Sequence, residues 1–414
     1  MTDPRHTDVL IVGGGIVGLA CAWYLLRAGR SVRIVEQRRL GNGSSFGNSG
    51  LITPSMAAPL AGPGVLRKLP GWLANPRSPL YVKPRLDLEF LAWAWRFAAF
   101  CNEASLLCAM RARHALLASS RQLFDELMEA ERFDCDWDTS GLYLVYRSEE
   151  EMCAGDALDP LLEDLGIAVQ HIDGAELLAR EPALRDGAIG ARHYPGDARL
   201  RPDRLLGELR GRLIERGAMI EEDREVRELR VDGDRVAGVG DWTAGDYVLA
   251  TGAWTAKFGR QLGLRLPIQP GKGYSLTMPR PASCPRHSLV LKERQVGVTP
   301  WASGFRIGGT MEFAGYDARL NPARIDAILA AAREYLVDPL TEADAERWYG
   351  WRPMTPDGLP LIGRSPRHRN LLIAAGHNML GVSMSPGTGR LVAELVNGQE
   401  PHLDAAPYAP GRFA

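Results

Sequence analysis

The chain has 414 residues, 45% of them hydrophobic, and a formal net charge of −1. This length and apolar content suffice for a full hydrophobic core and for two domains. Basic and acidic residues nearly cancel, at 49 and 50, and no run of lysine and arginine forms the electrostatic footprint of a nucleic-acid binder. The composition therefore argues against a nucleic-acid partner and favours a small molecule.

The cysteines form no C-x-x-C pair and no His/Cys cluster at zinc spacing. We interpret all six as reduced thiols: Cys21, Cys101, Cys108, Cys135, Cys153 and Cys284. No metal site is predicted. Because no secretory signal precedes the first predicted strand, we expect a reducing, cytoplasmic location of the bacterial type.

The first elements form one βαβ unit. Asp8 to Val12 is a short apolar run typical of a buried strand, Ile16 to Arg27 has helical spacing, and Ser31 to Glu36 is a second strand. The run from Val9 to Leu26 has the length of a membrane span. Its glycines at 13, 14, 15 and 18 indicate instead a strand that turns sharply into a helix.

The following segments alternate between helix and strand. Residues 41 to 63 are rich in Gly, Ser, Asn and Pro, which predicts a loop with free backbone amides. Helices are predicted at 86–100, 113–131, 149–165, 174–179, 202–216, 322–336 and 387–396. Strands are predicted at 141–146, 167–172, 218–222, 225–231, 236–240, 246–250, 274–278, 288–291, 296–299, 305–310 and 371–375.

The segment Gly13-Gly14-Gly15-Ile16-Val17-Gly18 fits the dinucleotide fingerprint G-x-G-x-x-G. The first glycine permits the turn, the second lets the backbone approach pyrophosphate, and the third lets the helix pack on the strand. Glu36 ends the next strand about twenty residues later, where its carboxylate can accept both ribose hydroxyls. The helix N-terminus favours the pyrophosphate anion. The fingerprint is shared by NAD and FAD, so it predicts a dinucleotide without naming it.

Three later segments favour FAD. Residues 43 to 52 supply small hydroxyl and amide groups along which an extended cofactor can run past its pyrophosphate. Residues 246 to 254 form a buried strand that ends in Thr251-Gly252 beside the first βα junction. Residues 376 to 381 are predicted to open the last helix, so that its amides face the flavin pyrimidine and stabilise reduced flavin.

In order along the chain, the most specific segments are APLAGPGV (58–65), KGYSLTMP (272–279), RIGGTMEFAGY (306–316), WRPMTPDGLPLIG (351–363) and GHNMLGVSMSPGTGRL (376–391). With these segments the chain resembles the D-amino-acid oxidase superfamily of flavoproteins over nearly its whole length, and bacterial D-amino-acid dehydrogenases most of all. The resemblance implies non-covalent FAD, and no cysteine stands where a covalent flavin link is expected.

The fold class expected is α/β (α+β overall), with a Rossmann-like FAD-binding domain and a substrate domain on a mostly antiparallel sheet. The boundaries predicted are 1–85, 186–266 and 345–414 for the discontinuous FAD-binding domain, and 86–185 and 267–344 for the substrate domain. The predicted cofactor-binding residues are Gly13, Gly15, Ile16, Val17, Gly18, Glu36, Gln37, Arg38, Ser44, Ser45, Asn48, Gly50, Leu51, Ile52, Val226, Thr251, Gly252, Trp254, Gly376, Asn378, Met379, Leu380 and Gly381.

Three residues are predicted to serve the substrate. Arg352 lies between Trp351 and Pro353, and a guanidinium is the side chain best suited to a bidentate grip on a carboxylate. In the family that it resembles, the arginine of this motif holds the substrate carboxylate; the alternative is a structural ion pair. Tyr274 either directs its hydroxyl to the same carboxylate or packs in the core. His377 is either a general base or a loop histidine that caps a helix.

The resemblance implies a FAD-dependent dehydrogenase that oxidises D-amino acids by hydride transfer from the α carbon to flavin N5. The resulting imino acid hydrolyses to a 2-oxo acid and ammonia. Cyclic D-imino acids such as D-proline or cis-4-hydroxy-D-proline are the alternative substrates, and a FAD subunit of a multi-protein amine dehydrogenase is the alternative assembly. Positioning, rather than acid–base catalysis, is expected to dominate.

A quinone or other electron acceptor is the expected second partner. Phe90, Trp93, Phe97 and Phe100 form an aromatic stripe at helical spacing. The stripe is interpreted as a core face, and the alternative is peripheral contact with the inner face of the cytoplasmic membrane, where a quinone would be accessible.

Overall fold

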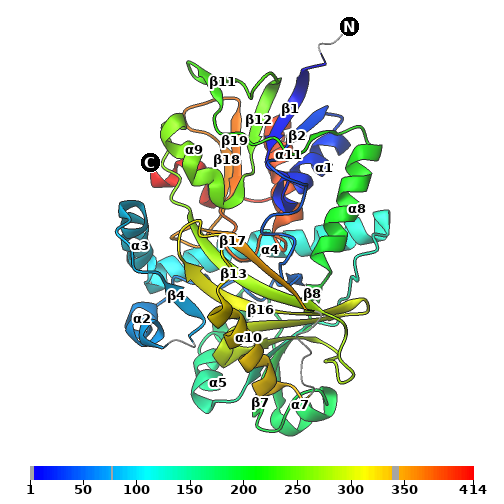
Figure 1. Cartoon of the computed structure of the whole chain (residues 1–414), viewed down its shortest axis with the longest axis vertical. Coiled ribbons are helices and arrows are strands. Elements are labelled where there is room, and N and C mark those ends of the chain that lie inside the picture. The colour runs from blue at the N-terminus through cyan, green and yellow to red at the C-terminus, as the bar shows by residue number, and fades with distance from the viewer. Residues whose placement is uncertain (1–3, 76–77, 338–344) are drawn as a thin grey trace.

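The computed structural model describes residues 4–75, 78–337 and 345–414. A six-stranded sheet occupies the upper part of Figure 1 and a nine-stranded sheet the lower part. The upper sheet has the order β18-β19-β12-β1-β2-β9 and is parallel except for the β18–β19 pair. Its strands are β1 (His6–Val12), β2 (Val32–Val35), β9 (Met219–Glu221), β12 (Thr243–Leu249), β18 (Leu361–Arg364) and β19 (Leu371–Ala375).

Both faces of the six-stranded sheet are buried, as its apolar strands require. Val9 and Ile11 of β1 join a core formed with α1 (Ile16–Arg27), α4 (Glu103–Glu131), α8 (Pro202–Glu215) and α11 (Ser385–Asn397). Leu10 and Val12 point to the other side, where α9 (Thr255–Leu262) and the hairpin of β10 (Arg230–Asp232) and β11 (Arg235–Gly238) pack. The predicted βαβ unit is confirmed.

The nine-stranded sheet follows the order β17-β13-β16-β15-β14-β5-β7-β6, with β4 paired to β16. Its pairs are antiparallel except β5–β14 and β4–β16. The strands are β4 (Leu80–Val82), β5 (Leu142–Tyr146), β6 (Gln170–Asp173), β7 (Gly190–Tyr194), β13 (Gln269–Met278), β14 (Ser288–Leu291), β15 (Val296–Trp301), β16 (Gly304–Phe313) and β17 (Glu346–Met354). One face packs on α7 (Gly174–Arg180) and α10 (Pro322–Tyr335). The remaining short elements are β3 (Leu51–Ile52), β8 (Ala198–Arg199), α5 (Glu149–Asp156) and α6 (Asp159–Asp164).

Two helices, α2 (Val65–Ala74) and α3 (Leu88–Phe100), lie on the same side of the molecule (Figure 1). Phe90, Trp93 and Phe97 of α3 pack with Met311, Phe313 and Met354, and Phe100 contacts Phe413. The interpretation of the aromatic stripe as a core face is therefore confirmed. The opposite face of α3 carries Leu88, Leu91 and Trp95, which are exposed. No described helix is long and apolar enough to cross a membrane.

Several predicted elements differ from those observed. The helix predicted from residue 113 begins at Glu103, where Asn102 caps it by accepting a hydrogen bond from the Ser105 amide. The helix predicted over 149–165 divides into α5 and α6, and the strand predicted over 225–231 shortens to β10. Strands β7 and β17 and helices α2 and α9 were not predicted. The ERWYGWRPM sequence of β17 contains a glycine and a proline, which weaken a strand pattern unless neighbouring strands support it.

The discontinuous two-domain boundaries stay a prediction. The two sheets do alternate along the chain, but β4, β7 and β17 fall within the segments predicted for FAD binding and pair in the nine-stranded sheet. Helix α4 falls within the segment predicted for substrate binding and packs into the core of the other sheet. The boundary between residues 344 and 345 adjoins residues outside the described part of the chain.

Candidate active site

A cavity of about 570 Å³ lies where the two sheets meet. This volume is in the range of cofactor and ligand sites. Its wall combines the first βα turn, the loop after β2, the residues after β12, strands β13 to β17 and the loop after β19. Segments that are far apart in the sequence therefore face one elongated space.

The glycines of the first βα turn have separate roles. Gly13 has φ +107°, and a Cβ there would come 2.5 Å from the Ala250 carbonyl oxygen. A Cβ at Gly18 would come 2.0 Å from the Gly13 oxygen, so this glycine allows α1 to pack on the turn. At Gly15 a Cβ would meet only the Ser45 hydroxyl, at 3.7 Å, since this position faces the cavity. The arrangement leaves room for a phosphate against the backbone of Gly15.

Glu36 follows β2 at the same end of the cavity. Its Oε2 accepts a hydrogen bond from the Gly14 amide at 2.7 Å, and its Oε1 accepts one from the Arg38 amide at 3.0 Å. A carboxylate has further acceptor capacity beyond these two bonds. The carboxylate is therefore held rigidly at the cavity wall with lone pairs left for ribose hydroxyls.

The loop over residues 43–50 is tied to the nine-stranded sheet. Ser45 accepts a hydrogen bond from the Ile16 amide at 3.1 Å, and Ser44 donates to the Trp351 carbonyl oxygen. Arg306, which is 1% exposed, donates to the carbonyl oxygens of Phe46 and Asn48 at 3.0 and 2.6 Å. These bonds fix the loop between the two sheets, where an extended cofactor would run.

The loop over residues 376–381 differs from its prediction. Helix α11 begins at Ser385, so these residues form turns that precede it rather than its first turn. The Asn378 amide donates to the Pro353 oxygen at 3.1 Å, and the Asn378 side chain bonds to Thr355 and to the Gly376 oxygen. Asn378 therefore holds this loop against the end of β17, and its amide is not free for a flavin.

Arg352 extends from β17 into the cavity. It donates a hydrogen bond to the Thr310 carbonyl oxygen, and no carboxylate within the described residues pairs with it. Burial lowers the pKa of this guanidinium to about 10, which leaves it charged near neutrality. The side chain is partly buried and its charge has no acidic partner among the described residues, so the site favours an anionic ligand.

The structure corrects the role predicted for Tyr274. Its hydroxyl donates to Glu312 Oε2 at 3.0 Å, and the ring packs with the core under α10. Burial and the Glu312 carboxylate raise the pKa of this phenol. Successive residues of a strand point to opposite faces, and position 273 faces Arg352. The Tyr274 side chain is thus directed away from the cavity, although the residue contributes to the wall.

Of the two roles predicted for His377, the geometry favours the loop histidine linked to a helix over the general base. His377 Nε2 lies 2.9 Å from Thr388 Oγ1, and the Thr388 hydroxyl itself donates to the Met384 oxygen. Nε2 must therefore carry the proton and donate. Burial lowers the pKa of this imidazole to about 3, so it is neutral and a weak base. The ring is a structural link between the loop and α11.

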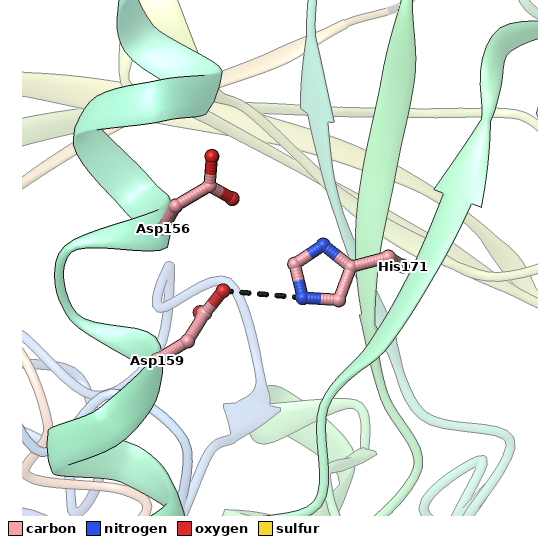
Figure 2. Close-up of side chains that lie close together, drawn as sticks. All are labelled: Asp156, Asp159 and His171. Atoms are coloured by element: carbon pink, nitrogen blue, oxygen red, sulfur yellow. Dashed lines mark ion pairs between the residues drawn. The ribbon is translucent and has the colours of Figure 1, made fainter.

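An acidic cluster outside the cavity wall is not interpreted as a metal site. Asp156, Asp159 and His171 lie close together (Figure 2), with His171 Nε2 at 3.1 Å from Asp159 Oδ2. Arg192 forms ion pairs with both carboxylates. The guanidinium therefore supplies the positive charge that balances the two acids.

The family model described as FAD dependent oxidoreductase matches residues 8–395. The chain belongs to this FAD-dependent oxidoreductase family.

Two curated relatives are named D-amino acid dehydrogenase. The protein of Granulibacter bethesdensis is 34% identical over 98% of this chain and 99% of its own length, and that of Paramagnetospirillum magneticum is 36% identical over 98% of each. Among solved structures, glycine oxidase from Geobacillus kaustophilus has a TM-score of 0.79 and 26% identity, with 99% of both chains covered. L-proline dehydrogenase from P. horikoshii, at 22% identity and a TM-score of 0.72, shares the fold.

As a member of the FAD-dependent oxidoreductase family, the protein uses FAD, and the wall of the cavity fits that cofactor. The Gly15 backbone is open to a phosphate, and Glu36 stands where a ribose is expected. The 43–50 loop and Arg352 line the same cavity, so its wall includes residues beyond the dinucleotide fingerprint.

Of the predicted cofactor-binding residues, most line the cavity: Gly13, Gly15, Ile16, Val17, Glu36, Gln37, Ser44, Ser45, Asn48, Leu51, Val226, Thr251, Gly252, Trp254, Asn378, Met379, Leu380 and Gly381. Five do not: Gly18, Arg38, Gly50, Ile52 and Gly376. Gly18 and Gly50 are used for close backbone packing, against the oxygens of Gly13 and Leu200. Ile52 is fully buried in the core.

Other lining residues had no signal in the sequence. Met56, Arg113, Trp348 and the pair Gly308-Gly309 reach the cavity from four separate segments. Lys272, in the KGYSLTMP segment, does not line the cavity and pairs with Glu312 at 3.0 Å. Only the pairing of β13, β16 and β17 determines which side chains of these strands face the cavity.

Proposed function

We propose that the protein oxidises D-amino acids to imino acids, which hydrolyse to 2-oxo acids and ammonia. The observation that carries this proposal is Arg352, a partly buried guanidinium in the cavity wall that has no acidic partner among the described residues. Its charge is matched by the α-carboxylate of an amino acid. The names of the curated relatives support the D stereochemistry.

Bound FAD supplies the hydride acceptor. The residues of the chain provide positioning: Arg352 holds the carboxylate, and the 43–50 and 376–381 loops shape the space beside it. Among the acids that line the cavity, Glu36 and Glu225 belong to the dinucleotide end. No general base stands beside Arg352 among the described residues, which is compatible with a substrate that reacts as the neutral amine.

Substitution of Arg352 tests the assignment. Arg352→Ala should raise KM for a D-amino acid by about a hundredfold or more, while FAD remains bound, because the carboxylate loses its desolvated partner. Arg352→Lys retains the positive charge but lacks the bidentate guanidinium. Its KM should therefore lie between those of the wild type and Arg352→Ala. An unchanged KM in both variants would exclude this role.

The nature of the substrate side chain requires a direct measurement. Cyclic D-imino acids such as D-proline and cis-4-hydroxy-D-proline remain the alternative substrates. Anaerobic titration of the purified protein with D- and L-amino acids, proline and hydroxyproline should bleach the flavin absorbance for the D series. Bleaching without added proteins would also exclude an obligatory multi-protein assembly. Reoxidation in air, compared with reoxidation by a quinone, would distinguish an oxidase from a dehydrogenase.

We further propose that the protein is cytoplasmic and contacts the inner face of the cytoplasmic membrane through α2 and α3. Six large apolar residues of this region are exposed: Leu66, Leu73, Leu86, Leu88, Leu91 and Trp95. Arg67 on α2 adds positive charge, and its neighbour Lys68 forms an ion pair with Glu151 at 3.6 Å. Apolar and aromatic residues flanked by basic ones suit an interface with anionic lipid, where a quinone acceptor is available.

Vesicle flotation tests this surface. The wild type should float with phosphatidylglycerol vesicles and bind phosphatidylcholine vesicles less. Leu91→Glu combined with Trp95→Glu should abolish flotation without loss of FAD, since both side chains point away from the core. Equal flotation of wild type and double variant would contradict the proposal.

A further inference from the structure

Arg113 is a second buried guanidinium in the cavity wall. It lies on α4, is 3% exposed, and donates to the carbonyl oxygens of Gly358 at 2.9 Å and Met56 at 3.1 Å. Its Nε has no hydrogen-bond partner among the described residues. Two carbonyl acceptors orient the group but leave its full positive charge in place.

The charge of Arg113 is not neutralised by a nearby acid. The carboxylate that influences it most is Asp357, and Asp357 already forms an ion pair with Arg412 at 2.7 Å. Burial lowers the pKa of Arg113 to about 10, so the side chain is still protonated at neutral pH. A lone cation in a low-dielectric wall acts on neighbouring charges much more strongly than one in water.

Arg113 is connected through neighbouring residues to the part of the cavity wall that carries Arg352. Its guanidinium binds Met56, which lines the cavity, and it borders a small hollow with Thr355, Asn378 and Met379. Asn378 in turn is bonded to the Pro353 oxygen, next to Arg352.

We infer that Arg113 stabilises the negative charge that the flavin gains on reduction, and so raises the reduction potential of the bound FAD. Helix α11 begins at Ser385, beyond the loop that was expected to supply this stabilisation through helical amides. A fixed cation in the cavity wall can stabilise the negative charge of reduced flavin without any rearrangement of the protein. The inference rests on FAD binding alone and does not depend on which amino acid is oxidised.

The test measures the sulfite affinity and the midpoint potential of the bound flavin rather than enzyme turnover. Sulfite forms an S–N5 bond with oxidised flavin, and its electron pair leaves the ring negatively charged, so its affinity reports on the same stabilisation. In Arg113→Gln and Arg113→Met, sulfite affinity should fall about tenfold or more. The two-electron midpoint potential should become more negative, a tenfold change corresponding to about 30 mV. Arg113→Lys, which keeps the charge, should remain close to the wild type.

Arg111→Gln is the matched control, because Arg111 is exposed on the same helix. FAD content and thermal stability should be measured for each variant. Either neutral substitution suffices if the other fails to retain FAD. If the lysine variant shifts as much as the neutral ones, or if no variant shifts, Arg113 is a structural link between Met56 and Gly358 and the inference is wrong. These outcomes are separate from those of substrate titration, since neither readout uses an amino acid.

Discussion

The guanidinium of Arg352 lies against the backbone of Gly273 in the adjacent strand. A Cβ at position 273 would come 2.2 Å from Arg352 Cζ and 2.3 and 2.5 Å from its two terminal nitrogens. Gly273 therefore creates the space that the guanidinium occupies, and the orientation of Arg352 depends on the absence of a side chain there.

Gly273→Ala should displace Arg352 while the fold is retained, because the atoms in the way are the far end of a flexible side chain. We expect KM for the amino acid to rise about tenfold or more with FAD content unchanged. Steady-state kinetics and the flavin absorbance check both. Gly207→Ala is the control, since a Cβ there meets nothing within 4 Å. A wild-type KM in Gly273→Ala would show that the guanidinium can bind from another position.

Gly15→Ala should separate cofactor binding from folding. A Cβ at Gly15 meets only Ser45 Oγ, at 3.7 Å, so the apoprotein should keep its thermal stability. The methyl group would occupy the space of the pyrophosphate, and the affinity for FAD should fall at least tenfold. Gly18→Ala should behave differently and unfold the protein, because its Cβ would lie 2.0 Å from a backbone oxygen. Fluorescence titration of apoprotein with FAD, beside thermal melts, distinguishes the two effects.

His377 should contribute to acid sensitivity and not to the catalytic pH profile. Its pKa is lowered by burial to about 3 in the folded protein, whereas an unfolded histidine titrates near 6.5. The unfolded state thus binds more protons between these values, and stability is lost as the pH falls below about 6.5. His377→Gln should reduce this loss. Urea denaturation between pH 4 and 7 measures this loss of stability. If the pH profile of activity keeps its shape in His377→Gln, His377 is not the general base.

Asp197 should change stability with pH in the opposite direction to His377. This carboxyl is 1% exposed and accepts hydrogen bonds from the amide and hydroxyl of Ser55, and burial raises its pKa to about 7. The folded state therefore binds more protons than the unfolded state between pH 4 and 7, and stability falls as the pH rises through this window. The cost of ionising the buried group is on the order of 4 kcal/mol.

Asp197→Asn can make both bonds to Ser55 without a charge, and it should stabilise the protein at pH 8 relative to the wild type. Thermal unfolding at pH 5 and pH 8 provides the comparison. An equal change at both pH values would show that ionisation of Asp197 does not limit stability.

The opening βαβ unit was predictable because its signals are local. A buried strand, a glycine turn and a helix follow one another within thirty residues, and the predicted helix Ile16 to Arg27 coincides with α1. Arg352 was also predicted from its motif, and the structure brings it to the cavity wall. The roles of Tyr274 and His377 were not predictable, because a side chain's direction depends on strand pairing and on hydrogen-bond partners distant in the sequence, such as Glu312 and Thr388.

The amino-acid sequence by itself was enough to predict a dinucleotide site over Gly13 to Glu36 and to single out Arg352 as the candidate partner of a carboxylate. These features depend on neighbouring residues and on the chemistry of single side chains. Only the tertiary structure decided which groups are free to act. It engages Tyr274, Lys272 and His377 in hydrogen bonds and ion pairs with other residues, and among the described residues it leaves the partly buried Arg352 and the buried Arg113 without an acidic partner of their own. Burial and pairing arise from contacts between elements far apart in the chain, so no local pattern reports them.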